Sequence, residues 1–206
     1  MSKNRRLARG SERIQDPQAL KALAHPARIR LLAELRTFGP LRVTDLVERC
    51  GLSPASTSYH LRQLAAHDFI REVPTLARDK REHWWEAAGS LTWSTADFLD
   101  RGDQLRVEVT LQEELLQLQI GRYRDYLASL PQLDPAWADA AANFEHTVRL
   151  SPKGLRKLYD QLQQLLEGIE SLPEPEHDDP LVRMVAVHFQ AFPLALEHQS
   201  SKETES

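Results

Sequence analysis

Residues 43–69 read VTDLVERCGLSPASTSYHLRQLAAHDF, and this stretch decides the fold of the first half of the chain. Residues 43–49 predict a short amphipathic helix with apolar residues on one side. Gly51 suits the left-handed conformation that closes a helix. Ser53 is a favourable N-cap and Pro54 suits the first helical position, so a second helix is expected to begin at this pair. The stretch therefore predicts two helices joined by a tight turn.

The second of these helices has two contrasting faces. Leu61, Leu64 and Ala65 recur at helical spacing and are expected to be buried. The other side is small or polar, which suits insertion into the major groove of DNA, because small side chains permit close approach and hydroxyls reach base edges. Together the two helices predict a helix-turn-helix. The residues expected to contact DNA from its second helix are Ser53, Ala55, Ser56, Ser58, Tyr59, His60, Arg62 and Gln63.

Two of these residues have distinct interpretations. His60 is explained equally well by a structural hydrogen bond inside the motif and by a direct phosphate contact, whereas a metal-binding role is much less favoured. Arg62 carries a permanent charge on a planar group that suits either guanine recognition or phosphate binding.

Regular structure is also expected on both sides of the motif. Helices are predicted over residues 16–24 and 26–38, the second with Pro26 in its first turn. Residues 70–74 and 82–87 alternate as two strands, which together form a wing. The charged tip of the wing is expected to contact the DNA backbone or minor groove through Arg78, Lys80 and Arg81. The alternative is that these charges are only solvated on a turn.

A family resemblance rests on the runs LKALAHPARIRLLAEL (20–35), VTDLVERCGLSPASTSYHLRQL (43–64), FIREV (69–73) and REHWWEA (81–87). Its specific parts are the Leu-Ala-His-Pro-x-Arg entry and the recognition-helix residues Ser58, His60, Leu61 and Leu64. Over residues 16–87 the chain resembles the ArsR-like winged-helix repressors, the arsenical-resistance and metallothionein-repressor family. The resemblance implies a dimeric winged-helix transcriptional regulator, usually a repressor that an inducer releases.

The metal-site residues of that family are missing. Residues 43–45 read Val-Thr-Asp where metal-sensing members carry cysteines. Residues 109–130 contain no histidine, whereas zinc-type members use histidine and carboxylate pairs on a C-terminal helix. We therefore expect no metal and no cofactor. The cluster His177, Asp178 and Asp179 lies in a proline-rich linker and is expected to be solvated.

Charge is distributed unevenly along the 206 residues. Residues 1–86 hold 16 basic and 10 acidic side chains, whereas residues 87–206 hold 10 basic and 20 acidic ones. Since cations neutralise phosphates and carboxylates are repelled by them, the DNA-facing part is expected to be N-terminal. A basic arm over residues 1–15 is expected to contact the DNA backbone or minor groove through Lys3, Arg5, Arg6 and Arg9.

Composition narrows the class of protein further. The content of 41% hydrophobic and 27% charged residues is typical of a globular chain with two domains. No long apolar run is present and no apolar stretch follows the basic N-terminus, so we expect neither a membrane span nor a signal peptide. The single cysteine, Cys50, fits a reducing compartment, and the protein is expected to be cytoplasmic.

Residues 94–130 predict one or two helices, with a possible break at Gly102 and an end at Pro131 and Pro135. Apolar residues recur along this segment about every seven residues and form a long seam, for which a second copy of the chain is the favoured partner. Packing inside its own domain is the alternative. The seam residues expected to dimerise the protein are Val109, Leu116, Ile120, Tyr123, Leu127 and Leu130.

Residues 141–193 suggest a small β-α-β unit. Residues 144–150 alternate as a strand, Ser151 and Pro152 begin a helix that runs to residue 170, and residues 182–192 form an apolar β-rich run. The predicted fold class is mainly α with small β: a winged helix-turn-helix domain followed by a helical domain that contains this unit. The expected domains are a basic arm (1–15), a DNA-binding domain (16–89), a dimerisation or effector domain (90–195) and a disordered tail (196–206).

These features predict a sequence-specific DNA-binding regulator, a repressor by resemblance, that acts as a homodimer on a pseudo-palindromic operator. Its expected partners are double-stranded DNA and a second copy, with an unknown small-molecule effector left open and no membrane. An enzyme is an alternative with little support, because the sequence lacks the usual catalytic motifs. A protein-interaction module is another, although such a helix is expected to expose apolar anchors.

Overall fold

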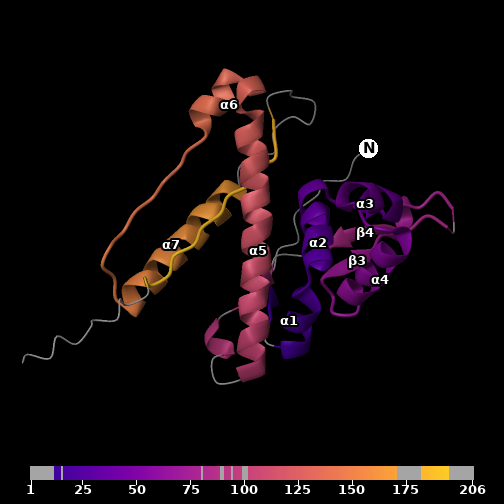
Figure 1. Cartoon of the computed structure of the whole chain (residues 1–206), viewed down its shortest axis with the longest axis horizontal. Helices are drawn as coiled ribbons and strands as arrows, with labels where there is room; N and C mark the ends of the chain where they lie inside the picture. Colours follow the sequence, from indigo (N-terminus) through magenta and orange to yellow (C-terminus); the bar gives the residue numbers. More distant parts are fainter. Residues whose placement is uncertain are drawn as a thin grey trace, which may run out of the picture. The chain divides into compact units, whose positions relative to one another are not determined.

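The computed structural model describes residues 12–14, 16–79, 81–88, 91–93, 95–98, 102–170 and 182–194. It divides into two compact units, Met1–Leu133 and Asp134–Ser206. The division falls after the long helix of residues 102–129, because that helix packs on the N-terminal helices. Figure 1 shows the elements of each unit.

The first two helices begin as the sequence predicts. Helix α1 (Pro17–Leu23) is capped by Asp16, whose carboxylate accepts the Gln18 N–H at 2.9 Å. Helix α2 (Pro26–Phe38) is capped by His25 and ends at Gly39, which has a φ of 79° that few other residues adopt. The residues of α2 that face the core are buried; they are Ala27, Ile29, Leu31, Leu32 and Leu35.

The next two helices form the predicted helix-turn-helix. Helix α3 (Val43–Cys50) ends at Gly51 in the left-handed conformation, with a φ of 62°. Helix α4 (Pro54–Ala65) follows after Ser53. Both helices pack on α2. The turn between them is short because one left-handed glycine reverses the chain.

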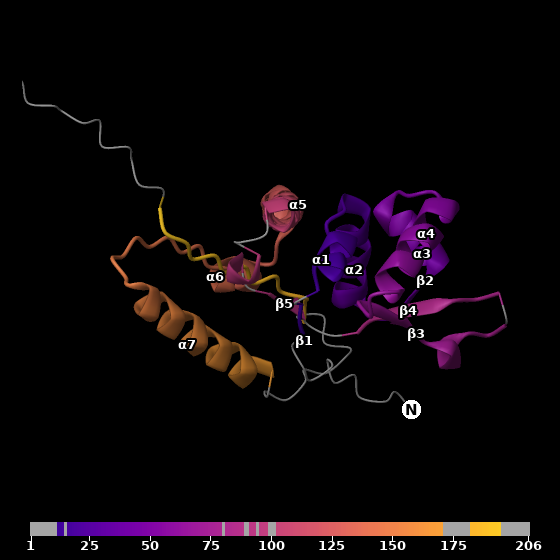
Figure 2. The same ribbon diagram turned by 90° about the horizontal axis from the view of Figure 1, so that it is seen from below.

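A small antiparallel sheet completes this part of the chain. Strands β3 (Ile70–Glu72) and β4 (Trp84–Ala87) pair with Arg71 opposite Glu86, and their side chains form an ion pair at 2.6 Å. A third strand, β2 (Leu41–Arg42), pairs with β4 on its other side and was not anticipated, since two residues are too few for a periodic pattern. Figure 2 shows the β3–β4 hairpin projecting beyond α4 as a wing.

Several short elements complete this unit. They are the 3₁₀ turns η1 (Pro74–Leu76) and η2 (Thr95–Asp97) and the two-residue parallel pair β1 (Glu12–Arg13) and β5 (Leu91–Thr92).

Helix α5 (Gly102–Ser129) is a single helix that begins at Gly102, the residue at which the sequence allows a break. One of its faces packs on the core through the fully buried Leu111 and the half-buried Val107, Leu115 and Leu118. The buried Glu108 accepts a hydrogen bond from the Thr95 hydroxyl at 2.9 Å. The helix ends before the 3₁₀ turn η3 (Leu130–Gln132), where Pro131 stops it as expected.

The second unit holds α6 (Pro135–Ala140), capped by Asp134, and α7 (Pro152–Glu170), whose start is capped by Ser151 as predicted. The expected β-α-β unit is not formed: of its elements only the helix is present, and residues 141–150 and 182–194 contain no strand. Alternation marks a segment as suited to a sheet but does not supply its partner strand, and within the described residues neither segment has one. The fold class is nevertheless mainly α with small β, as predicted, and the larger sheet of the described residues has three strands.

Among the described residues, none of the helices combines the length and the apolar character that a membrane crossing requires. The basic arm before residue 12, the linker cluster at residues 177–179 and the tail from residue 196 lie outside the described residues.

Candidate nucleic-acid interface

The start of α4 is held by its own cap. The Ser53 hydroxyl accepts the Ser56 N–H at 3.2 Å, and the Ser53 carbonyl accepts the Thr57 N–H at 2.9 Å. Pro54 occupies the first helical position, where it needs no hydrogen-bond partner. The direction of the helix is therefore set at its first turn, where an inserted helix would meet DNA.

Four side chains anchor α4 to the protein. Thr57, His60, Leu61 and Leu64 are buried, and their spacing of three and four residues places them on one side of the helix. This anchoring fixes the rotation of α4 about its axis. The side chains on the opposite side are consequently presented outward in a defined arrangement.

The outward side of α4 carries most of the residues predicted to contact DNA. Ser53, Ala55 and Arg62 are exposed, and Tyr59 is 53% exposed. Ser56, Ser58 and Gln63 are half-buried on the flanks of this surface. We call this set the α4 surface. It combines small residues near the helix start with an aromatic ring and a permanent cation one and two turns later.

His60 does not belong to the α4 surface, and its predicted contact with phosphate is not supported by its position. The side chain is 8% exposed and its ring lies 4.5 Å from the ring of His25, centroid to centroid. His60 follows the buried Thr57 by three residues and therefore lies on the same, inward side of α4. Because histidine is polar, the sequence did not indicate that this residue is buried. Its burial agrees with a structural role, but among the described residues its Nδ1 has no hydrogen-bond partner, so the predicted structural hydrogen bond is not seen at this atom.

Burial and neighbouring charge both act on this histidine pair. Burial lowers the pKa of His60 below its ordinary value, and the adjacent His25 and Arg28 lower it further. The pKa of His25 is lowered in the same way, first by burial and then by Arg28. Its Nδ1 accepts the Ala27 N–H at 3.1 Å, so His25 acts as an N-cap in its neutral form.

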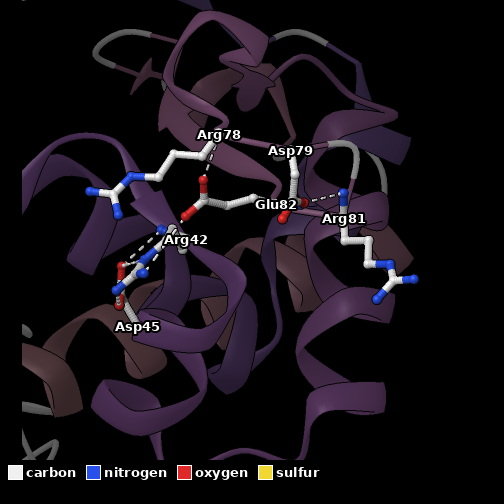
Figure 3. A network of polar contacts seen from close by, with 6 residues as sticks. All are labelled: Arg42, Asp45, Arg78, Asp79, Arg81 and Glu82. Carbon is white, nitrogen blue, oxygen red and sulfur yellow. Dashed lines mark hydrogen bonds and ion pairs between the residues drawn. The ribbon is translucent and has the colours of Figure 1, made fainter.

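The wing is stiffened by carboxylates that accept hydrogen bonds from its backbone. Glu82 accepts the Arg78 N–H at 2.7 Å, and Asp79 accepts the Arg81 N–H at 2.7 Å (Figure 3). The first of these bonds is the main reason why the pKa of Glu82 lies below its usual value. The acidic residues of the tip therefore shape the turn.

Arg42 holds the base of the wing and was not identified from the sequence. Its guanidinium donates to the Asp45 carboxylate at 2.7 and 3.0 Å and lies 3.7 Å from Glu82 (Figure 3). It also lies 5.7 Å from the ring centre of Trp84. The hydrogen bond from Arg42 is the main cause that lowers the pKa of Asp45. The sequence feature that could have indicated this role is the spacing of three residues between Arg42 and Asp45 at the start of a helix.

The side chains of Arg78 and Arg81 are exposed and point away from the carboxylates that their backbones bind (Figure 3). Among the described residues neither guanidinium forms an ion pair. Lys80, the third predicted wing cation, lies outside the described residues. The two arginines therefore present permanent charge beyond the edge of the sheet.

The seam of α5 is exposed along its length. Its members are Val109 (45% exposed), Leu116 (40%), Tyr123 (45%), Leu127 (44%) and Leu130 (41%), with Ile120 half-buried among them. Leu130 lies one residue beyond the end of α5, in η3. The opposite face of the same helix is packed on the core. Unit 1 therefore leaves the seam exposed.

Metal ligands do not converge in the part of the chain that the structure describes, where no group of three or more His, Cys, Asp or Glu side chains could hold an ion. Cys50 is buried in the core, and burial raises the pKa of its thiol, which disfavours the thiolate that metals require.

Comparison with known proteins agrees with this geometry. Residues 23–73 match the family described as helix-turn-helix domain. A segment of 50 residues is 46% identical to the HTH-type transcriptional regulator NmtR of Mycobacterium tuberculosis. That match covers 24% of this chain and 41% of NmtR, so the chain spans less than half the length of this relative.

Solved structures show only weak similarity. The homodimeric winged helix-turn-helix DNA-binding domain of a possible ArsR-family regulator from Mycobacterium bovis aligns at a TM-score of 0.32 and 18% identity, covering 54% of this chain and 83% of that domain. The YusO protein of Bacillus subtilis aligns at a TM-score of 0.31 and 16% identity, covering 74% and 84% of the two chains. Alignments at this level carry no weight for either fold or function.

The fold and the family match together define the class: residues 23–73 match a helix-turn-helix domain, and the hairpin β3–β4, which starts at the end of this range, forms a wing. The resemblance to ArsR-like regulators expected from the sequence is confirmed for this part of the chain.

Proposed function

We propose that this protein is a transcriptional regulator without enzymatic activity that binds double-stranded DNA as a homodimer, with α4 in the major groove. The observation that carries the proposal is the α4 surface: a capped helix whose buried side is anchored by Thr57, Leu61 and Leu64 and whose outward side is small and polar. Such a helix fits the groove by shape, and its hydroxyls and cation match base edges and phosphates.

Arg62 and Tyr59 are proposed to read sequence. Both project from the α4 surface, in the second and third turns of the helix, so they are proposed to reach base edges once the N-terminal end of α4 lies in the major groove. Arginine pairs with guanine through two parallel hydrogen bonds, and one such contact discriminates by about 1–3 kcal/mol. The smaller residues Ser53, Ala55 and Ser56 are proposed to allow the backbone to approach the groove.

Arg78 and Arg81 are proposed to contact the DNA backbone from the wing. Their exposed side chains leave a turn that Glu82 and Asp79 hold in shape, so the cations are placed before DNA is met. A contact with phosphate is independent of base sequence. The wing is therefore proposed to add affinity, whereas α4 adds specificity.

The exposed seam of α5 is proposed to join two copies. Val109, Leu116 and Tyr123 follow each other at intervals of seven residues on a face that unit 1 leaves in solvent. A continuous apolar stripe of this kind is stabilised by a second helix. A two-fold dimer presents two α4 surfaces and so predicts a pseudo-palindromic operator. The resemblance implies that the regulator represses transcription, and the position of that operator tests this role.

A mobility-shift titration with the DNA upstream of the coding sequence, repeated over a range of salt concentrations, tests the proposal. Arg62→Ala is expected to reduce the preference for this DNA over random DNA by about 1–3 kcal/mol. Arg78→Ala is expected to weaken binding to both and to lower the salt slope by about one. Lys157→Ala, which removes an exposed cation from α7, is the matched control and should change neither quantity. Binding that is indifferent to sequence, or unchanged in Arg62→Ala and Tyr59→Ala, contradicts the proposed readout.

A further inference from the structure

Residues 144–150 of the second unit, Phe-Glu-His-Thr-Val-Arg-Leu, form a segment with strand character and no strand partner. Figure 1 shows this part of the chain as an elongated trace before α7. Phe144 and His146 stack with their ring centres 5.9 Å apart, as side chains two residues apart do on one face of an extended backbone. Phe144 is 87% exposed and Val148 54% exposed. Within the described residues, this segment forms no backbone hydrogen bonds.

The order of residues in this segment is complementary to itself. When two copies run antiparallel about a two-fold axis at Thr147, each residue faces the one at the mirrored position. Glu145 then faces Arg149 and Phe144 faces Leu150, and each of these pairs occurs twice. Opposite charges and apolar pairs that face each other across strands are stabilising, whereas like charges are destabilising.

We propose that residues 144–150 pair with the same segment of a second copy, as antiparallel strands centred on Thr147. The pairing supplies hydrogen-bond partners for the exposed backbone and an oppositely charged partner for both Glu145 and Arg149. It also places Phe144, Val148 and Leu150 on one shared face, where aromatic and aliphatic residues of two strands contact each other.

The other strand-like segment of this unit is a poorer partner. Residues 182–194 carry a cation, Arg183, but contain neither aspartate nor glutamate. Pairing with this segment would therefore leave Arg149 without a carboxylate opposite it. Charge complementarity for this reason favours a second copy over residues of the same chain.

This inference rests on the homodimer of the proposed function and adds a second contact between the copies, separate from the seam of α5. A chain whose edge strand is covered by its own symmetry mate is protected from indiscriminate pairing. The contact also gives a role to residues 144–150. The sequence predicted a strand there, but the single chain provides no sheet for it.

Disulfide trapping in the full-length chain tests the pairing. Cys50 is first replaced by alanine so that Thr147→Cys introduces the only thiol. In the proposed register the two Cα atoms of residue 147 face each other about 5 Å apart, within disulfide range. The matched control is Glu145→Cys in the same background, whose two copies lie roughly 13 Å apart along the strands. Mild oxidation is expected to give a covalent dimer with Thr147→Cys and several-fold less with Glu145→Cys.

Charge reversal provides a second readout. Glu145→Arg places two arginines opposite each other and is expected to lower the yield of the residue-147 disulfide, and adding Arg149→Glu is expected to restore it. Equal cross-linking at residues 145 and 147, or no rescue by the double reversal, overturns the pairing.

Sedimentation and mobility-shift measurements on the same preparations separate this inference from the proposed function. A dimer that retards DNA but does not cross-link at residue 147 overturns only the pairing. Cross-linking at residue 147 without specific DNA binding supports the pairing and contradicts the proposed function.

Discussion

The fold buries the apolar residues of the helix-turn-helix part but leaves apolar residues of the later helices exposed. Leu46, Leu61 and Leu64 are at most 1% exposed in a core closed within one chain. By contrast, Leu116 on α5 is 40% exposed and Leu165 on α7 is 61% exposed. The first region is complete by itself, whereas the second region has apolar surface that a partner is needed to cover.

This difference indicates that one set of residues stabilises the folded monomer and another set joins two copies. The N-terminal core holds the α4 surface in position without help from a second copy. The exposed seam contributes to stability only when it is covered, so its substitutions are expected to act on the dimer and not on the fold of the monomer. Each of the following predictions tests one side of this contrast.

The largest effect is expected inside the N-terminal core. Leu61→Ala removes a side chain that is 1% exposed and leaves a cavity, so it is expected to lower the free energy of unfolding by about 2–5 kcal/mol. Leu165→Ala, at a position that is 61% exposed, is the matched control and is expected to change it by no more than about 0.5 kcal/mol. Urea denaturation of the two variants measures both. Equal losses would show that α7 is covered as fully as the core.

A substitution in the seam is expected to affect assembly. Leu116→Glu places a charge in the proposed contact and is expected to raise the dimer dissociation constant on the order of 100-fold, as the loss of a central contact of about 2–4 kcal/mol does. Gln117→Glu adds the same charge at the neighbouring exposed residue and serves as the control. Sedimentation at a series of concentrations gives both constants. A dimer unaffected by Leu116→Glu would place dimerisation elsewhere.

The smallest effect is expected from the histidine pair. Because burial and Arg28 lower the pKa values of His25 and His60 in the folded chain, the unfolded chain binds more protons once the pH falls below their ordinary value of 6.5. Stability is therefore complete above pH 6.5 and decreases as the pH falls below it. Asp45 and Glu82, whose pKa values are also lowered, lose their contributions at more acidic pH, below their ordinary values of 3.8 and 4.5.

Urea denaturation at pH 7.5 and at pH 5.5 measures this dependence. His60→Gln is expected to make the two curves more alike than they are in the unsubstituted chain. An unchanged difference between the two pH values would show that the histidines do not cause it.

Local signals explain why the helix-turn-helix was predictable. Gly51, Ser53 and Pro54 act through backbone geometry and hydrogen bonds to near neighbours, so their effects can be recognised without knowing the rest of the fold. His60 was harder, because its burial depends on α2 and on His25, which lies 35 positions earlier in the chain. Likewise, Arg42 reaches the wing only after β2 pairs with β4.

The second half was less predictable for a related reason. The heptad spacing of Val109, Leu116 and Tyr123 correctly indicated an apolar stripe on a long helix. The alternation of residues 144–150 indicated a strand equally clearly, yet a strand is stable only with a partner, and a single sequence does not name the partner. The boundary between the two compact units falls after α5 because α5 packs on α1 and α2, and a local sequence pattern does not indicate such long-range contacts.

The central claim is that the α4 surface meets DNA, and site-directed cleavage tests it most directly. Ala55→Cys, in a chain with Cys50→Ala, is labelled with an iron chelate that cuts nearby DNA, and Lys157→Cys in α7 carries the same label as the control. The account predicts that the label at residue 55 cuts the upstream DNA at two places about one helical turn apart, while the label at residue 157 does not. Absence of cleavage from residue 55 under conditions where the protein is bound, or the same cleavage from residue 157, would contradict it.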